Sequence, residues 1–283
     1  MMLTEHGWKA ANDNEKTFDA AADSYLRMGG SQRYLAPVIE YFRGRLVATI
    51  VSAEVRQMGI EVFPGCKAAT INRQALTPAR AILNHAHELG WCSAIRVRSF
   101  KTEKPIKLPA VNGEWMSKFI SQADADGLYH LSAIVFFMQD CAARVSEACN
   151  VLGEHVDIRN KTIRLAKTKT ETNATAYLTD ECAYRIAHLP MKEGERVFRY
   201  SSRWSVNDRI AAVCRRAQIE YRPSHTLGRR TYATRAIKLG VPIKVAMDGG
   251  RWKTPAVFLG YVDIDNAGRI VAEKINSHRY ANL

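Results

Sequence analysis

The spacing of apolar and polar positions predicts that the first part of the chain is helical. After a polar N-terminus, apolar residues begin to recur at helical intervals. The clearest run has steps of three and four residues, which place its members on one helix face: Leu76, Ala79, Leu83 and Ala86. We therefore predict a disordered N-terminus over residues 1–16 and a helical domain over residues 17–97.

The periodicity is lost after this domain and then changes. Residues 98–112 contain two prolines and little apolar periodicity, which is typical of a linker between domains. Helical spacing returns from Gly113, is interrupted by three short strand-like runs, and resumes near Glu181. The strand-like runs are Val156–Ile158, Thr162–Ala166 and Ala176–Leu178. The expected fold is mainly α with a small antiparallel β-sheet, and the second domain covers residues 113–283.

The charge of the chain indicates a polyanionic partner. Its formal net charge is +13, and basic residues are in excess on both sides of residue 112. Such an excess attracts nucleic acid, although a soluble protein can also simply be basic. The six cysteines form no C-x-x-C pair and have no histidine at metal-ligand spacing, so we expect reduced thiols and no metal. Since no signal peptide or membrane-length apolar run is present, we expect a cytoplasmic protein.

Two segments of the second domain carry side chains suited to a phosphate. Arg144, expected early in a helix, has a planar charged fork that fits two phosphate oxygens. Glu147 would share its helix face and orient it, although such pairs are commonly surface ion pairs. Lys167 and Lys169 lie in a K-T-K-T run at the expected hairpin, on one face of the strand. A lysine there could donate a proton to a leaving alkoxide, although hairpin lysines commonly serve solubility alone.

A third segment, residues 224–261, contains His225, Arg229, Trp252 and Tyr261. A histidine and an arginine near the opening of one helix can both face a bound anion, which the helix dipole also favours. Taken singly, a histidine or a tyrosine is more commonly structural than catalytic. The order and intervals of these residues are therefore more informative than any one of them.

In that order and spacing the chain resembles the tyrosine recombinases, the phage integrase family. The interval from Arg144 to Lys169 is 25 residues, and that from Trp252 to Tyr261 is nine. The family has an arginine in a context such as A-R-x-S-E, a hairpin lysine about 25 residues later, and a histidine or tryptophan nine residues before a tyrosine. The run ATINRQALTPARAILNHAHELGW also looks like part of the family's helical core-DNA-binding domain.

The resemblance implies a role for each residue of this motif. Tyr261 would be the nucleophile that attacks the scissile phosphate, and Arg144 and Arg229 would clamp that phosphate. Lys169 would be the general acid for the leaving 5′-oxygen, and His225 would assist proton transfer. The product would be a covalent 3′-phosphotyrosine.

Two more positions follow from the same resemblance. Trp252 stands where many relatives have histidine, and its indole N–H can only donate, so it would bind a phosphate oxygen. Glu147 would support Arg144 from behind. Since two arginines and a lysine would neutralise the charge, no cofactor is implied.

The chain also departs from the family's pattern. Three residues separate His225 from Arg229, whereas the family usually has two. Either the turn bulges there, helped by Gly228, or Thr226 takes the histidine's place. Arg230 is then the alternative to Arg229. Lys167 is the alternative to Lys169 as the general acid. Ala142 stands where relatives often carry glycine.

The implied function is site-specific recombination of duplex DNA, for the integration or excision of a mobile element or prophage. Chromosome-dimer resolution, DNA relaxation of the type IB topoisomerase kind and a catalytically silent DNA-binding relative are the alternatives. Phosphate contacts are expected from Lys67, Arg73, Lys101, Lys104 and Lys107. We expect a homotetramer on synapsed DNA in the bacterial nucleoid. The C-terminal tail, with Ile270, Val271 and Ile275 at helical spacing, would dock on a neighbouring protomer or pack on its own domain.

Overall fold

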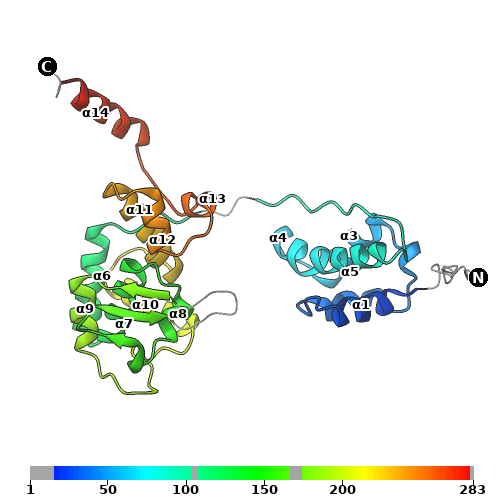
Figure 1. The fold of residues 1–283 in the computed structure, drawn as a ribbon, viewed down its shortest axis with the longest axis horizontal. Helices are drawn as coiled ribbons and strands as arrows, with labels where there is room; N and C mark the ends of the chain where they lie inside the picture. Colours follow the sequence, from blue (N-terminus) through cyan, green and yellow to red (C-terminus); the bar gives the residue numbers. More distant parts are fainter. Residues whose placement is uncertain (1–15, 104–106, 166–173, 281–283) are drawn as a thin grey trace, which may run out of the picture. The chain divides into compact units, whose positions relative to one another are not determined.

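The computed structural model describes residues 16–103, 107–165 and 174–280, with side chains up to Ser277. The chain divides between Ile106 and Lys107 into two compact units (Figure 1). Each unit has its own apolar core. None of the described helices is both long and apolar enough to cross a membrane.

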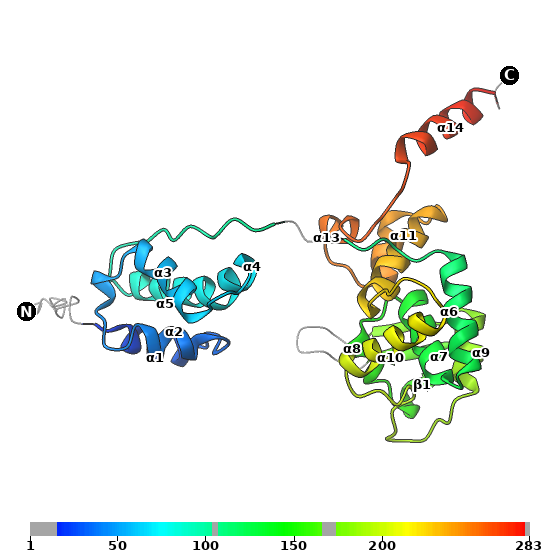
Figure 2. The same cartoon turned by 180° about the vertical axis from the view of Figure 1, so that it is seen from behind.

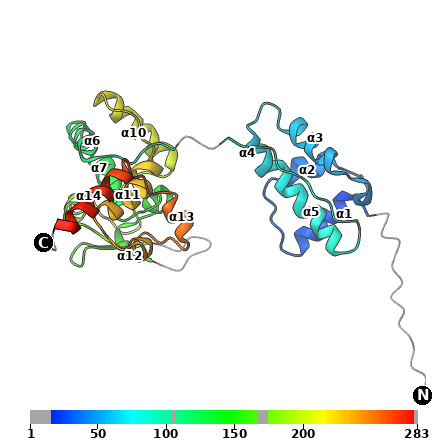
Figure 3. The ribbon, with the colours of Figure 1, turned by 90° about the horizontal axis from the view of Figure 1, so that it is seen from above.

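The first unit is a bundle of helices (Figure 3). Its elements are α1 (Phe18–Arg27), α2 (Leu35–Tyr41), the 3-10 turn η2 (Val47–Thr49), α3 (Ser52–Val62), α4 (Ala68–Ile71), the π turn η3 (Asn72–Leu76) and α5 (Thr77–Glu88). Thr17 caps α1, because its hydroxyl accepts a hydrogen bond from the backbone N–H of Ala20 at 3.3 Å. The predicted apolar stripe is buried in this core, and the predicted helical character of the region is confirmed.

The first residues of the expected linker are bound to this unit. The guanidinium of Arg56 donates to the carbonyl oxygen of Arg98 at 2.8 Å and lies over the ring of Phe100 at 4.3 Å. The side chain of Asn72 forms two hydrogen bonds with the backbone of Phe100: its amide donates to the carbonyl at 2.9 Å, and its oxygen accepts from the N–H at 2.8 Å. The chain up to Phe100 is therefore fixed on α3 and η3.

The second unit contains a three-stranded antiparallel sheet in the order β1-β2-β3. The strands are β1 (Val156–Asp157), β2 (Thr162–Leu165) and β3 (Ala174–Tyr177). Ile163 pairs with Ala176, and both are buried, because alternate residues of a strand face the core. The predicted fold class, mainly α with a small antiparallel sheet, is confirmed.

Helices make up most of the rest of this unit (Figure 2). They are α6 (Gly113–Ala125), α7 (Tyr129–Asp140), α8 (Val145–Cys149), the 3-10 turn η4 (Gly153–His155), α9 (Asp180–Ala187), α10 (Arg203–Arg216), the π turn η5 (Thr226–Arg230), α11 (Thr231–Lys238), α12 (Ile243–Gly249), α13 (Pro255–Leu259) and α14 (Ala267–Tyr280). Helix α7 is buried along most of its length and packs against α6, α9 and η5. Phe119, Phe137 and Phe198 are fully buried in the main core.

A smaller apolar cluster lies beneath the segment that ends at Tyr261. Its buried members come from α11, α12, α13 and the turns between helices: Ala142, Ala233, Ala236, Ala246, Met247, Trp252 and Phe258. Tyr261 and Tyr232 are partly buried against it. Because one cluster joins these segments, it brings together residues that are more than 100 positions apart in the sequence.

Candidate active site

Tyr261 lies just after α13 and is held at its backbone from two directions. The hydroxyl of Thr234, on α11, donates to the carbonyl of Tyr261 at 3.5 Å and accepts from the N–H of Asp263 at 3.0 Å. The ammonium of Lys107 donates to the carbonyl of Gly260 at 3.3 Å. The Tyr261 ring packs edge-on against Trp252, with ring centres 5.4 Å apart. These contacts fix the tyrosine while leaving its ring partly exposed.

His225 lies beside the Tyr261 hydroxyl. Its Nε2 atom is 3.3 Å from the hydroxyl oxygen, which is within hydrogen-bond distance. Thr226 is instead buried, and its N–H donates to the carbonyl of Pro223 at 2.8 Å. Of the two registers that the sequence allows, the structure therefore has the one that places His225, not Thr226, next to the tyrosine.

The extra residue between His225 and Arg229 is accommodated by the π turn η5. A π turn holds one more residue per hydrogen-bonded ring than an α-helix, so an inserted residue need not rotate the following helix. The hydroxyl of Thr231 closes the turn by donating to the carbonyl of Thr226 at 2.9 Å. Gly228 faces α7, where a Cβ would lie 3.1 Å from the Cβ of Met138, so a larger residue would require the turn or α7 to shift by a few tenths of an ångström.

Arg229 is buried and held by carbonyl groups. One terminal nitrogen donates to the carbonyls of Ala142 at 3.1 Å and Gly250 at 2.9 Å. Its guanidinium carbon lies 3.7 Å from the centre of the Trp252 ring, which is a close cation–π contact. Arg230, the alternative to Arg229 in the sequence, is also buried, but it is Arg229 that contacts Gly250 and the Trp252 ring.

Trp252 contributes a buried donor to the same place. It is 5% exposed, and its indole nitrogen has no hydrogen-bond partner among the described residues. The ring stacks near Tyr232 and meets Phe258 edge-on. A Cβ on Gly250 would lie 1.8 Å from this ring, so only glycine fits there. A buried N–H without a partner is unusual in a folded protein, and an incoming acceptor would satisfy it.

Arg144 precedes α8 as its N-cap residue, whereas the sequence had suggested a position inside a helix. The helix breaks because Ala142 adopts a left-handed conformation (φ 52°), where relatives often have glycine. Glu147 is buried and binds Arg144 twice: Oε1 accepts from Nη1 at 2.5 Å, and Oε2 accepts from the backbone N–H at 2.8 Å. The Arg144 side chain remains 41% exposed. Glu147 therefore fixes the orientation of the arginine at the start of α8.

The positive charges in this cluster change the protonation of their neighbours. Burial, and then the charges of Arg144 and Arg251, lower the pKa of Arg229 to about 10. Burial, and then Arg230 and Arg229, lower the pKa of His225 below its usual value. At neutral pH Arg229 is still charged, whereas His225 is neutral and able to accept a proton. An anion bound here would relieve the repulsion between the arginines.

The remaining predicted residues are six lysines and Arg73. Lys104, Lys167 and Lys169 are outside the described residues. Lys67, Arg73 and Lys101 are exposed on the first unit, and Lys107 is exposed on the second with its ammonium on Gly260. Within the described ranges, no group of histidine, cysteine, aspartate and glutamate side chains is arranged to hold a metal ion.

One arginine at the site was not selected from the sequence. Arg251 directly precedes Trp252, and its guanidinium lies within hydrogen-bond distance of Glu147 and of the backbone before Arg144. Its only signal in the sequence was that it adjoins a residue of the motif.

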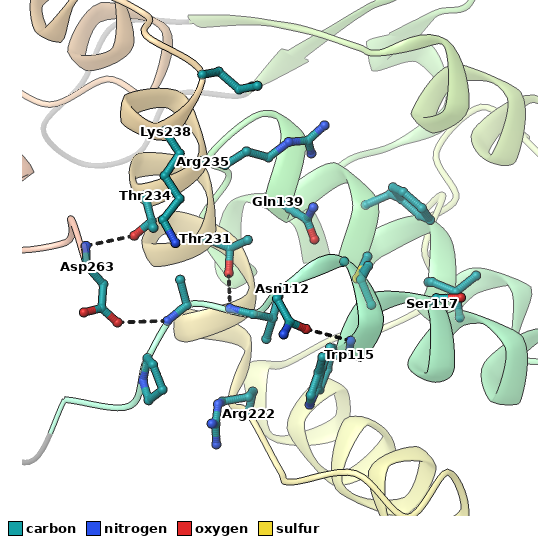
Figure 4. Close-up of a pocket in the computed structure, with 18 of the residues that line it drawn as sticks. Asn112, Trp115, Ser117, Gln139, Arg222, Thr231, Thr234, Arg235, Lys238 and Asp263 are labelled. Carbon is teal, nitrogen blue, oxygen red and sulfur yellow. Dashed lines mark hydrogen bonds between the residues drawn. The ribbon is translucent and has the colours of Figure 1, made fainter. Parts of the chain in front are cut away.

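A separate cavity of about 1030 Å³ lies beside α11 (Figure 4). Much of its lining comes from residues 109–113 and 115–117, from the exposed end of α11 and from Asp263. At the cavity, the Thr231 hydroxyl accepts a hydrogen bond from the N–H of Val111 at 3.3 Å. Tyr261, His225 and Arg229 are not among its lining residues. The polar cluster is thus distinct from this cavity.

Comparison with known proteins identifies the family. The model of the Phage integrase family matches residues 112–267, which is more than half of the chain. Comparison with curated proteins gave no match.

Solved structures with the same fold match nearly the whole chain. The Tn1549 transposon integrase in complex with transposon right end DNA has a TM-score of 0.70 at 14% identity, over 93% of this chain and 100% of that one. A lambda integrase dimer bound to a COC′ core site has a TM-score of 0.66 at 14% identity, over 89% of this chain and 97% of that one. XerH site-specific recombinase bound to palindromic difH substrate has a TM-score of 0.58 at 16% identity, over 92% of this chain and 76% of that one.

The family model spans the segment in which Arg144, His225, Arg229, Trp252 and Tyr261 are brought together. The chain belongs to the phage integrase family, the tyrosine recombinases, whose catalytic domain breaks and rejoins DNA strands by phosphoryl transfer.

Proposed function

We propose that this protein is a site-specific recombinase of the integrase type, with Tyr261 as the nucleophile. The observation that carries the proposal is the 3.3 Å distance between the Tyr261 hydroxyl and Nε2 of His225, next to Arg229 and Trp252. A neutral histidine at that distance can take the proton of the attacking hydroxyl. Integration or excision of a mobile element is the role we favour, and resolution of chromosome dimers is the alternative.

The reaction exchanges one phosphate ester for another. The Tyr261 oxygen forms a bond to the scissile phosphorus, the bond from phosphorus to the 5′-oxygen breaks, and a 3′-phosphotyrosine remains. The tyrosine proton passes to His225, and Lys169 donates a proton to the leaving 5′-oxygen, with Lys167 as the alternative donor. Because the ester bond is conserved, the reverse attack rejoins the strand without ATP.

The arginines and the tryptophan stabilise the charge that develops on the phosphate. Arg144 is partly exposed and oriented by Glu147, so it can bind nonbridging oxygens. Arg229 is fixed by two carbonyls and stays charged. The indole N–H of Trp252, which has no partner in the described part of the chain, would donate to a phosphate oxygen. Preorganised donors of this kind supply much of the rate enhancement in phosphoryl transfer.

Duplex DNA is the proposed substrate, in a synaptic complex that contains four copies of the chain. The net charge of +13 supports it, as do exposed basic residues on both units: Lys67, Arg73, Lys101 and Lys107, with Lys104 outside the described residues. Ile270, Val271 and Ile275 of α14 are 40 to 56% exposed, which favours docking of the tail on a second copy over packing on its own domain.

A nicked suicide duplex tests the proposal, because loss of the cleaved fragment traps the covalent protein–DNA adduct. We expect the wild-type protein to form it on its cognate site and Tyr261→Phe to form none while binding DNA with nearly unchanged affinity. An adduct in the Tyr261→Phe variant would refute the assignment. Strand exchange between two cognate duplexes is expected as well, and relaxation of supercoils without exchange would indicate topoisomerase activity instead.

A further inference from the structure

Arg251 occupies an unfavourable backbone conformation in the middle of the candidate site. Its φ is 59°, in the left-handed region that residues with a Cβ adopt only at an energetic cost. Its side chain is only 13% exposed, although arginine is rarely buried without partners. Glycine would relieve the backbone at this position. The contacts of the guanidinium must therefore offset that strain.

Those contacts converge on the turn that carries Arg144. The guanidinium donates to the carbonyl of Cys141 at 3.3 Å and to that of Ala142 at 3.4 Å, and it donates to Glu147 Oε2 at 3.3 Å. It also donates to the carbonyl of Gly249, at the end of α12, at 3.5 Å. One side chain thus connects the end of α12 with Cys141 and Ala142, which precede Arg144, and with Glu147, which follows it.

Two groups are shared between Arg251 and the proposed phosphate-binding arginines. The carbonyl of Ala142 accepts from Arg251 at 3.4 Å and from Arg229 at 3.1 Å. The carboxylate of Glu147 accepts from Arg251 through Oε2 and from the Arg144 guanidinium through Oε1. The backbone of Ala142, like that of Arg251, is in the left-handed conformation (φ 52°). The hydrogen bonds to its carbonyl hold this turn in place and so fix the direction of the carbonyl.

We propose that Arg251 is a positioning residue: by binding Glu147 and the Ala142 carbonyl together, it sets the guanidinium of Arg144 for the scissile phosphate. This inference rests on the function proposed above. We assign Arg251 no phosphate contact, because both of its terminal nitrogens donate to protein oxygens and its side chain is mostly buried; its Nε is also buried and has no partner among the described residues. Among the described residues, removing it would leave the Glu147 carboxylate bound to Arg144 alone, so that the two side chains could move together.

The test uses single-turnover cleavage of the suicide duplex at saturating DNA. Arg251→Gly suits the backbone conformation and removes the side chain, whereas Arg251→Lys keeps the charge but loses the fork. We expect Arg251→Gly to slow cleavage by about 30- to 100-fold. Arg251→Lys should recover about a third or more of that loss on a logarithmic scale. Both variants should bind DNA with an affinity within about threefold of that of the wild type. Thermal unfolding and DNA binding establish that each variant is folded; if Arg251→Gly does not fold, Arg251→Lys alone must slow cleavage.

A double-mutant cycle with Glu147→Gln separates positioning from a general loss of structure. If Arg251 acts through Glu147, the double variant is no more than about threefold slower than the slower single variant. Effects that multiply, or unchanged cleavage in Arg251→Gly, would overturn the inference.

Arg185→Ala is the control. The Arg185 side chain is 19% exposed, so it is buried to a similar extent, and it is paired with Asp124 and Glu181. It lies on α9, outside the cluster around Tyr261. It should leave the cleavage rate unchanged, and a rate loss equal to that of Arg251→Gly would also overturn the inference. Failure of the wild-type protein to form any adduct would refute the proposed function instead.

Discussion

The π turn η5 in the second unit can be compared with η3 in the first. Both span five residues, and both lead into an α-helix whose first residue is threonine. In each, that threonine hydroxyl closes the turn on the carbonyl five residues earlier, Thr231 on Thr226 at 2.9 Å and Thr77 on Asn72 at 2.8 Å. The backbone device is the same in the two units.

What the two turns present is different. In η3 the side chain of Asn72 binds the backbone of Phe100, and Arg73 is exposed. In η5 the side chain of Arg229 is buried against Trp252, and His225, just before the turn, faces Tyr261. A π turn in itself therefore does not indicate a reaction; the side chains that it directs do.

The largest expected difference between the two turns concerns their arginines. Arg229→Lys should slow cleavage at saturating DNA by about 10²- to 10³-fold, because the buried fork that neutralises the phosphate is lost. Arg73→Lys should leave that rate unchanged, and Arg73→Ala should lower DNA affinity with a shallower dependence on salt. Rapid-quench cleavage and binding titrations at several salt concentrations would measure both. Equal losses of cleavage rate in the two turns would remove the distinction.

The residue before each turn provides the second test. Ile71 precedes η3 and is buried, whereas His225 precedes η5 and has a pKa below 6.5. Since the neutral imidazole accepts the tyrosine proton, cleavage at subsaturating DNA should be constant near neutral pH and should fall only as the pH drops through that lowered pKa. His225→Gln should be slower by about 100-fold at pH 7 and should lose this acid limb. An acid limb centred above pH 6.5 in the wild type would contradict the assignment.

The threonines that close the turns should have smaller effects. Thr231→Val removes the bond that closes η5, so His225 and Arg229 shift relative to each other and cleavage slows by about tenfold. Thr77→Val should lower the free energy of unfolding by about 1 kcal/mol and leave the rate at saturating DNA unchanged. Chemical denaturation and single-turnover cleavage of both variants make a matched pair. A rate loss in Thr77→Val equal to that in Thr231→Val would show that neither turn is specific to the reaction.

The sequence predicts much of this fold because burial repeats with the helical and strand periods. The stripe from Leu76 to Ala86 is buried, and the three strands form where the alternation changes. The order and spacing of His225, Arg229, Trp252 and Tyr261 led to the prediction that they act together, and the structure places these four residues next to one another.

The local backbone was not predictable in the same way. A π turn and an α-helix use the same residue types, so only the extra residue between His225 and Arg229 indicated an irregularity, and nothing indicated η3. The left-handed conformations of Ala142 and Arg251 are set by tertiary contacts, not by intrinsic preference, which disfavours them. The role of Arg251 follows from partners more than 100 residues away.

Mapping the trapped adduct by mass spectrometry tests the central claim most directly. Trypsin should release residues 254–269 as one peptide, TPAVFLGYVDIDNAGR, in which Tyr261 is the single tyrosine. After nuclease digestion, we predict that a 3′-phosphonucleotide is attached to this peptide, at Tyr261. Attachment to a peptide that contains another tyrosine, such as Tyr232, would contradict the account.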